Sequence, residues 1–191
     1  MSRDEPVEVK HYIQHRYPRE INFCALCGGA MTSRIVLPDR RRQRVCSRCG
    51  YVAFLSPKLV AGCLVVENGR VLLLLRRAVE PQLGRWTFPG GYVDLGESPA
   101  QAAARETLEE VGMDVRVENL LGLYWSEPRP PTVVAVYLAA PTDKPPRTSE
   151  EASEVAYFAP ELIPWKEIAF RTTRAALRDW TAARQAARTN F

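Results

Sequence analysis

Four glutamates within residues 91–113 have the residue type and the spacing of a divalent-cation site. Glu97 precedes a predicted helix, and Glu106, Glu109 and Glu110 follow at positions i, i+3 and i+4, which places these three on one helical face. Like charges on one face repel each other, and a divalent cation would remove that repulsion. Clustered carboxylate oxygens suit Mg²⁺ or Mn²⁺ better than Zn²⁺, and such ions assist reactions at phosphate. The alternative interpretation is a solvated acidic face.

The sequence marks both ends of the helix that carries these glutamates. Ser98 is a suitable N-cap, Pro99 suits the first helical position, and Gln101 completes a capping box with Ser98. Gly112 marks the C-terminal end. An apolar stripe on another face is expected to pack against the rest of the domain, and it consists of Ala104, Leu108 and Val111.

The spacing of the whole segment matches the Nudix box, in which a glycine, a glutamate, an Arg-Glu pair, a Glu-Glu pair and a final glycine stand at fixed offsets. The positions that fill this pattern are Gly91, Glu97, Arg105, Glu106, Glu109, Glu110 and Gly112. Thr107 stands where the pattern prefers an aliphatic residue, which concerns the packing of the helix and not the chemistry. The chain therefore resembles a Nudix hydrolase. The resemblance implies an α/β/α sandwich with mixed sheets that hydrolyses a pyrophosphate bond.

The box glutamates are expected to hold the catalytic Mg²⁺ or Mn²⁺. Glu106 and Glu110 lie one turn apart and are predicted to be the principal ligands, with Glu109 assisting. By resemblance to the family, the backbone carbonyl of Gly90 adds an oxygen ligand.

The arginine of the box and a later acidic run are expected to support the metal site. Arg105 and Glu97 are expected to pair and to pin the loop onto the helix. In the family the general base is either a box glutamate or a carboxylate from a later loop. The acidic run Glu150, Glu151 and Glu154 occupies the matching region, and Glu154 or Glu151 is the predicted additional ligand or base, the alternative being a solvated loop.

Candidate substrate contacts come from two residue classes. Arg76 and Arg77 end a predicted strand near the expected cleft and could contact phosphate, although surface arginines are common. Aromatic rings could stack on an adenine or a flavin, although core packing is the alternative for each of them. The aromatic candidates are Trp86, Phe88, Tyr124 and Trp125.

Four of the five cysteines form two Cys-x-x-Cys pairs separated by eighteen residues, which predicts a structural zinc site. The four ligands are Cys24, Cys27, Cys46 and Cys49. Glycine follows each pair, and Thr32–Leu37 and Arg41–Cys46 are predicted to form a hairpin between them, so the segment is predicted to be a zinc ribbon held together by its metal. Disulfides or redox thiols are the alternatives. Cys63 lies in an apolar strand and is expected to be a buried, inert thiol.

The chain is predicted to contain an N-terminal arm (1–20), the zinc ribbon (21–55) and a Nudix domain (56–191) that ends in an amphipathic helix within 165–188. Asn68-Gly69 is a strong hairpin signal between two strands. Strands are predicted at Lys58–Val66, Arg70–Arg76, Val115–Val117, Leu120–Trp125, Thr132–Ala139 and Val155–Phe158. Strands around one central helix, with a second helix at the end, indicate the α/β class.

Composition limits the function classes. The chain has 191 residues, an apolar fraction of 46% and no run suited to crossing a membrane, and its start lacks the apolar core of a signal peptide, so a cytoplasmic protein is expected. The net charge is +4, with an acidic middle and basic ends. This distribution fits a polyanionic substrate held through cations, and it permits contact with nucleic acid.

The substrate is predicted from the segment beyond the box. A ribbon followed by a Nudix domain resembles the NADH pyrophosphatases, but residues 126–132 lack the two aromatics of their signature. Pro128, fifteen residues beyond the box, is associated with ADP-ribose hydrolysis in the family, and the overall resemblance is to plant-type FAD and ADP-ribose pyrophosphatases. The prediction is hydrolysis of FAD or ADP-ribose to AMP plus FMN or ribose 5-phosphate, with NADH second.

A different class of function is also compatible with the ribbon. Arg40, Arg41, Arg42 and Arg44 make its hairpin basic, so the chain could be a nucleic-acid-binding or ligand-sensing protein with a non-catalytic Nudix domain. A combined interpretation is removal of an NAD cap from RNA, with the ribbon contacting the strand. A homodimer is an expectation from the family alone.

Overall fold

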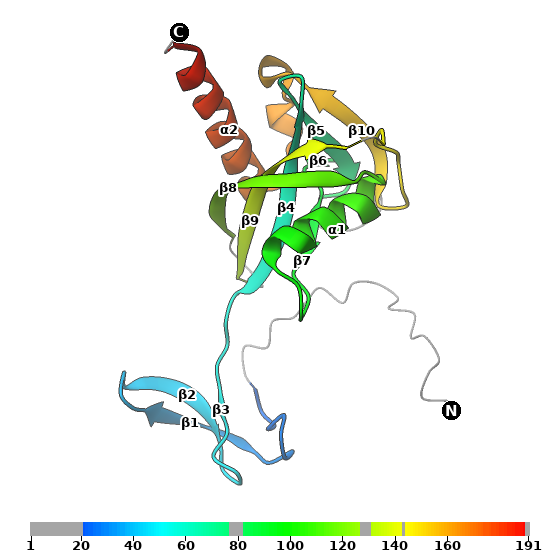
Figure 1. Ribbon diagram of the computed structural model, residues 1–191. Coiled ribbons are helices and arrows are strands. Elements are labelled where there is room, and N and C mark those ends of the chain that lie inside the picture. Colours follow the sequence, from blue (N-terminus) through cyan, green and yellow to red (C-terminus); the bar gives the residue numbers. More distant parts are fainter. Residues whose placement is uncertain (1–20, 77–81, 127–130, 143, 190–191) are drawn as a thin grey trace, which may run out of the picture. The chain divides into compact units, whose positions relative to one another are not determined.

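The computed structural model describes residues 21–76, 82–126, 131–142 and 144–189 (Figure 1). The chain divides into two compact units between Pro57 and Lys58, and each unit has its own hydrophobic core. This division falls two residues after the predicted boundary. Within the described ranges no helix is both long enough and apolar enough to cross a membrane.

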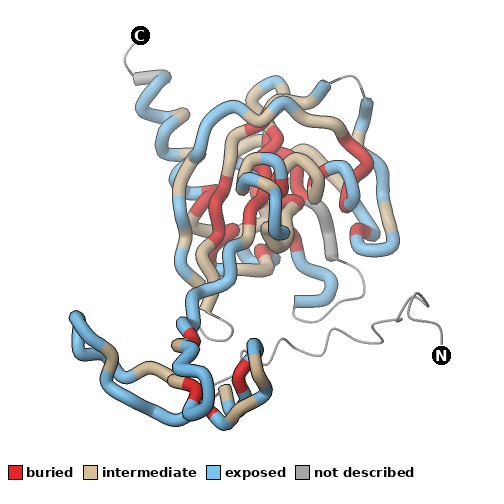
Figure 2. Tube along the Cα trace, turned by 60° about the horizontal axis from the view of Figure 1, so that its bottom comes forward, coloured by how far each residue is buried: buried red, intermediate tan, exposed pale blue. Residues whose placement is uncertain are grey.

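The first unit is built around a three-stranded antiparallel sheet. Its strands are β1 (Met31–Val36), β2 (Arg41–Cys46) and β3 (Val52–Ala53), in the order β1-β2-β3. The predicted hairpin is confirmed, because Met31 pairs with Cys46 and Val36 pairs with Arg41. Figure 2 shows how little of this unit is buried. Its small core consists of Cys24, Met31, Cys46 and Ala53.

The second unit contains a seven-stranded mixed sheet. Five strands lie in the order β10-β5-β4-β9-β8. They are β10 (Ala152–Phe158), β5 (Arg70–Arg76), β4 (Lys58–Glu67), β9 (Thr132–Pro141) and β8 (Val115–Ser126). The short strand β6 (Trp86–Thr87) pairs with β5, and β7 (Gly90–Tyr92) pairs with β4. Strands β4 and β9 run parallel, whereas the other pairings are antiparallel.

The hairpin between β4 and β5 turns at the predicted residues. Asn68 and Gly69 have φ angles of 48° and 76°, so both adopt the left-handed conformation that a two-residue hairpin turn of this type requires.

Helices cover both faces of the sheet. Helix α1 (Pro99–Val111) packs on one face, where Cys63 and Val65 of β4 point, and helix α2 (Arg171–Thr189) packs on the other, where Leu64 points. Two short 3₁₀ helices precede α2, at Pro160–Leu162 (η1) and Trp165–Glu167 (η2). The predicted α/β/α sandwich with mixed sheets is confirmed.

The predicted bounds of strand β8 and of the C-terminal helix are wrong. The sequence predicts two short strands where β8 runs without a break from Val115 to Ser126. Register shifts at Val117/Asn119 and at Leu120/Gly122 interrupt the alternation of inward and outward residues, but they do not end the strand. The C-terminal helix begins at Arg171 and not near residue 165, because η2 occupies the segment before it.

Candidate active site and zinc cluster

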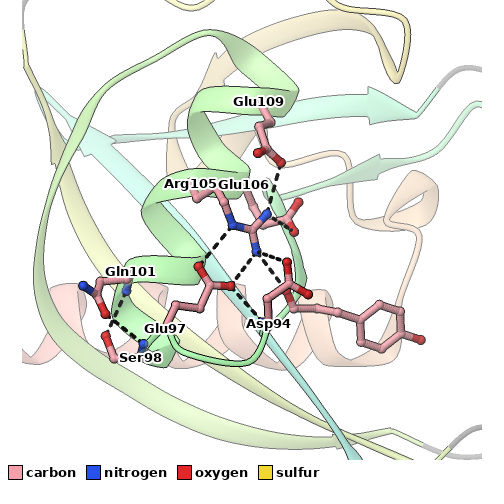
Figure 3. Close-up of polar contacts among 8 residues, drawn as sticks. Asp94, Glu97, Ser98, Gln101, Arg105, Glu106 and Glu109 are labelled. Atoms are coloured by element: carbon pink, nitrogen blue, oxygen red, sulfur yellow. Dashed lines mark hydrogen bonds and ion pairs between the residues drawn. The ribbon is translucent and has the colours of Figure 1, made fainter. Parts of the chain in front are cut away.

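Helix α1 has the two ends that the sequence predicts. Ser98 Oγ accepts a hydrogen bond from Gln101 N at 3.3 Å, and Gln101 Oε1 accepts one from Ser98 N at 2.8 Å, which completes the capping box (Figure 3). Gly112 has a φ of 66°, and its N–H donates to the Leu108 carbonyl at 2.9 Å. Because both ends are fixed, the helix holds its glutamates in a defined position.

The apolar stripe predicted on α1 is wrong for two of its three residues. Leu108 is 42% exposed and Ala104 is half-buried, whereas Val111 is buried as predicted. Thr107 is buried instead, because its hydroxyl donates to the Ala103 carbonyl at 2.7 Å, which satisfies the polar group and leaves the methyl group to pack. The buried residues of the helix are Ala102, Ala103, Thr107, Glu110 and Val111.

Arg105 lies at the centre of a carboxylate cluster (Figure 3). Its Nε and Nη2 donate to the two carboxylate oxygens of Glu97 at 3.1 and 2.7 Å. Its Nη1 donates to Glu106 Oε1 at 2.9 Å and to Glu109 Oε2 at 3.1 Å, and Nη2 also donates to the Tyr92 carbonyl at 3.1 Å. The hydrogen bonds to Glu97 and Glu106 raise the pKa of Arg105 further, so the guanidinium remains charged and ties the loop, β7 and α1 together.

The Glu97–Arg105 pair makes a pH-dependent contribution to stability. Hydrogen bonding to Arg105 holds the pKa of Glu97 below its usual range. The contribution is therefore fully present above the pKa of about 4.3 of an unfolded glutamate, and it is lost as the pH falls through the lower folded pKa. Urea unfolding of wild type and Glu97→Gln is expected to show a difference in the free energy of unfolding at pH 7 that shrinks at pH 3. An equal difference at both values would contradict this assignment.

Glu110 joins the helix to strand β7. Its side chain is 8% exposed, and its Oε2 accepts a hydrogen bond from the Gly90 N–H at 2.8 Å. Gly90 in turn pairs with Gly62 of β4, where a side chain would not fit, because a Cβ on Gly90 would lie 2.6 Å from the Ala61 carbonyl oxygen. The close approach of β7 and β4 therefore fixes the amide that orients this carboxylate.

Gly91 provides the space that Glu106 occupies. A Cβ on Gly91 would collide with the carboxylate of Glu106, so the first glycine of the box is required for close contact between β7 and α1.

The substitution Gly91→Ala is expected to displace the Glu106 carboxylate and to lower kcat by about 10²-fold, because displacements near 1 Å at a reacting centre have effects of this size. The thermal midpoint is expected to change little, since the glycine lies outside the buried core. Steady-state kinetics with melting curves would check both. Unchanged kcat would show that the position of Glu106 is not critical.

The electrostatics of Glu106 fit a divalent cation. Burial raises the pKa of its carboxyl above the usual range, the bonds to Arg105 oppose this effect, and the negative charges of Glu109 and Glu151 add to the rise. A half-buried carboxylate that is crowded by the negative charges of Glu109 and Glu151 gains from a hard cation. Carboxylate donors of this kind suit a divalent cation.

Glu151 is held near this cluster by a folded loop. Ser149 Oγ accepts hydrogen bonds from the backbone N–H groups of Glu151 and Ala152 at 3.2 and 3.1 Å. Arg147 N donates to the Val111 carbonyl at 2.8 Å and ties the loop to the end of α1. The negative charge of Glu151 contributes to the raised pKa of the Glu106 carboxyl.

Glu154 has a different position from the one expected. Strand β10 begins at Ala152 and not at Val155, because residues 152–154 join the ladder with β5 through a bulge. Glu154 therefore lies within the strand, paired with Leu75, and its side chain is exposed.

Two of the aromatic residues predicted to contact the substrate lie in the core. Trp86 and Phe88 are buried in the core under α2, and the Trp86 ring packs edge-on against Phe158 with ring centroids 4.9 Å apart. Their burial reflects tertiary packing that local sequence does not reveal. Tyr124 is half-buried, and its hydroxyl donates to Asp179 of α2 at 2.8 Å, which places it on the same face. Trp125, its neighbour on β8, is 54% exposed.

The first arginine candidate lies at the end of a sheet strand. Arg76 ends β5, and its backbone pairs with Ala152, one residue from Glu151. Arg77 and Pro128 lie outside the described residues.

The four cysteines of the ribbon have the geometry of a zinc site. Their sulfurs all lie within 4.8 Å of one another, with Cys24 and Cys49 separated by 3.6 Å and Cys27 and Cys46 by 3.5 Å. Four thiolates at 2.3 Å from a tetrahedral zinc ion would have sulfurs about 3.8 Å apart, so this donor set fits the ion.

The two Cys-x-x-Cys turns also have the predicted backbone. Gly28 and Gly50, the residues that follow the pairs, have φ angles of 69° and 75°. The backbone N–H groups of Arg48 and Cys49 donate to Cys46 Sγ at 3.3 and 3.4 Å, which stabilises a thiolate at that position. Cys63 lies apart in the second unit, where burial raises the pKa of its thiol to about 11, as expected for an inert thiol.

Two contributors to the glutamate cluster were not predicted. Asp94 lies 3.9 Å from the Arg105 guanidinium, and Ser149 holds the loop of Glu151. Asp94 stands three residues before Glu97 in the same loop, and its acidic side chain could have indicated a second partner for Arg105. Ser149 could have been suspected from the tendency of serine to accept hydrogen bonds from the amides that follow it.

Comparison with known proteins identifies both units. A family model for the NUDIX domain matches residues 56–181, and a model for the Nudix N-terminal zinc ribbon matches residues 22–54. A crystal structure of a NUDIX hydrolase from Nitrosomonas europaea is 34% identical with a TM-score of 0.78, over 87% of this chain and 93% of that chain.

Curated relatives match mainly the second unit. A MutT-like protein of Streptomyces ambofaciens is 40% identical over 54% of this chain and 64% of its own length. An ADP-ribose pyrophosphatase of Methanocaldococcus jannaschii is 31% identical over 60% of this chain and 69% of its own length. An NAD-capped RNA hydrolase of Photobacterium profundum is 32% identical over 50% of this chain and 34% of its own length. The chain thus spans less than two thirds of the first and third of these relatives.

The family model covers most of the chain, and the glutamates, arginine and glycines of its signature gather around α1 and β7 as described above. The chain belongs to the Nudix hydrolase family, with a Nudix N-terminal zinc ribbon preceding the hydrolase domain.

Proposed function

We propose that the protein is a divalent-metal-dependent pyrophosphatase that hydrolyses FAD or ADP-ribose to AMP plus FMN or ribose 5-phosphate. The observation that carries this proposal is the position of Glu106 and Glu110, a half-buried and a buried carboxylate held side by side against β7. The M. jannaschii relative, named an ADP-ribose pyrophosphatase, supports the choice of substrate class.

Each residue of the cluster has a defined task in this proposal. Glu106 and Glu110, with Glu109 and the Gly90 carbonyl, would hold Mg²⁺ or Mn²⁺, which neutralises phosphate oxygens and acidifies water. Arg105 keeps the Glu106 carboxylate oriented through its 2.9 Å hydrogen bond and balances part of the charge.

Glu151 is the proposed general base. It lies on a loop outside α1, its backbone is fixed by Ser149, and its side chain is exposed, so it can accept the proton of the attacking water. Arg76, whose backbone lies next to Ala152, is the proposed phosphate contact on the same edge of the sheet.

The substitution Glu151→Gln is expected to lower kcat by about 10²- to 10⁴-fold, the usual contribution of a general base. The matched control is Glu154→Gln, which removes the same charge from the neighbouring strand and is expected to retain activity within about twofold. Steady-state kinetics of both variants would check the assignment. A larger loss in Glu154→Gln would transfer the role to that residue.

An apolar surface could receive the adenine or flavin ring. Trp125 of β8 pairs with Val133 of β9, and Val133 pairs with Leu59 of β4. These three residues form a row across the sheet, on the face that α1 covers. Ala61, two residues from Leu59 and so about 7 Å along β4, pairs with Gly91 beside the glutamates. Trp125 is therefore the proposed stacking residue. In Trp125→Ala, KM for FAD and ADP-ribose is expected to rise with kcat little changed.

NADH, or the NAD cap of RNA, is the second candidate substrate. The P. profundum relative, named an NAD-capped RNA hydrolase, favours it. Competition assays with FAD, ADP-ribose, NADH and NAD-capped RNA at equal concentration would rank the values of kcat/KM. A kcat/KM for NADH or capped RNA above that for both FAD and ADP-ribose would replace the first choice.

A further inference from the structure

The sheet of the ribbon leaves one of its faces without a core. Met31, Cys46 and Ala53 are buried on the face that meets the cysteine cluster. Successive residues of a strand point to opposite faces, so the intervening residues form a second face, here called the bare face. The residues of the bare face are Thr32, Arg34 and Val36 of β1, Arg41, Gln43 and Val45 of β2, and Val52 of β3. All of them are exposed or half-buried.

The ribbon is a cationic module. Residues 22–54 contain six arginines and one aspartate, and they contain no lysine, glutamate or histidine. A zinc ion with four thiolates carries two negative charges, which leaves a net charge of +3 on this short segment. Such a density of positive charge favours polyanions.

Among the described residues, three of the six arginines make polar contacts within the ribbon, and three do not. Arg41 pairs with Asp39, with Nε 3.6 Å from the carboxylate. Arg44 Nε donates to the Ile21 carbonyl at 2.9 Å, and Arg48 Nη1 donates to the Cys27 carbonyl at 3.4 Å. In the part of the chain that the structure describes, no polar group holds the side chains of Arg34, Arg40 or Arg42. These three are exposed, with Arg34 on the bare face and Arg40 and Arg42 at the end of the hairpin.

Exposed aromatic rings flank the same sheet. Phe54, which follows β3, is 68% exposed, and Phe23, which bridges to Ala30, is 73% exposed. Aromatic rings beside arginines are the two components that sequence-tolerant binding of single strands requires, because bases stack on the rings while arginines contact phosphates.

We propose that the ribbon hairpin binds single-stranded nucleic acid, with Arg34, Arg40 and Arg42 at the phosphates and Phe54 and Phe23 available for stacking. This binding does not depend on the hydrolytic reaction.

The test is fluorescence anisotropy of a labelled fifteen-nucleotide RNA with the zinc-loaded full chain, without Mg²⁺ or Mn²⁺, across a series of salt concentrations. The triple variant Arg34→Gln, Arg40→Gln, Arg42→Gln is expected to raise Kd by at least about tenfold. The variant is also expected to bind with a weaker salt dependence. The slope of log K against the logarithm of the salt concentration should fall in magnitude by about 2, since each phosphate contact with a single strand contributes roughly 0.7.

The matched control removes three exposed arginines from the second unit, as Arg116→Gln, Arg171→Gln, Arg178→Gln, and it is expected to bind as wild type does. An equal loss in both variants, or no loss in the ribbon variant, would overturn the proposal. Tighter binding to duplex DNA or to polyglutamate than to the RNA would also overturn it. ADP-ribose hydrolysis, measured separately, is expected to be unchanged in the ribbon variant, so failure of the proposed reaction would leave the binding result interpretable.

Discussion

Replacement of Glu110 by glutamine is expected to lower kcat for ADP-ribose or FAD by about 10³-fold or more, equivalent to roughly 4 kcal/mol of transition-state stabilisation. Glutamine has nearly the same shape, and its amide oxygen can still accept the hydrogen bond from Gly90 N–H that the carboxylate accepts at 2.8 Å. The change therefore removes charge and metal affinity at a buried position while it leaves the link between α1 and β7 in place.

The control for this variant is Glu161→Gln, which removes a charge from the exposed 3₁₀ helix η1 and is expected to keep full activity. Melting curves would show whether Glu110→Gln remains folded. A folded Glu110→Gln protein with more than about a tenth of wild-type kcat would remove this residue from the set of metal ligands.

Replacement of Cys46 by serine is expected to unfold the ribbon and to leave the second unit intact. The ribbon core has only four buried residues, and structural zinc contributes on the order of 10 kcal/mol to the folding of such modules. Zinc content is expected to fall from one ion per chain to less than about a tenth of that, with loss of amide protection in residues 22–54. The second unit has separate cores, so its unfolding transition and its hydrolysis of ADP-ribose are expected to persist.

Cys63→Ala is the matched control, because it removes a thiol from the second unit and not from the cluster. Its zinc content is expected to stay at one ion per chain. Retention of zinc and of amide protection in Cys46→Ser would contradict the four-thiolate site.

Features set by local sequence could be predicted closely. The capping box of Ser98 and Gln101, the hairpin turn at Asn68-Gly69 and the two cysteine turns each depend on a few adjacent residues. The fixed spacing of the box likewise placed Glu97, Arg105 and Glu106 correctly relative to each other, because one helix and its cap determine their geometry.

Features set by tertiary packing could not be predicted. In the sequence, the aromatic residues Trp86 and Phe88 look the same whether they stack on a substrate or pack in the core. Only the packing of α2 on the sheet shows that they are core residues. The bulges of β8 depend on its pairing with β9. The burial of Thr107 depends on a hydrogen bond to the Ala103 carbonyl, which hydrophobic periodicity does not encode. The sequence places Glu151 and Glu154 in one acidic run, whereas the structure has Glu151 in the loop before β10 and Glu154 within the strand.

The most direct test of the proposed reaction is mass-spectrometric analysis of the products formed from ADP-ribose and FAD by the zinc-loaded protein with Mg²⁺ or Mn²⁺. The proposed reaction yields AMP with ribose 5-phosphate from ADP-ribose and AMP with FMN from FAD, and both products disappear in Glu110→Gln. Release of ADP, products that persist in Glu110→Gln, or no turnover of either compound by wild type would contradict it.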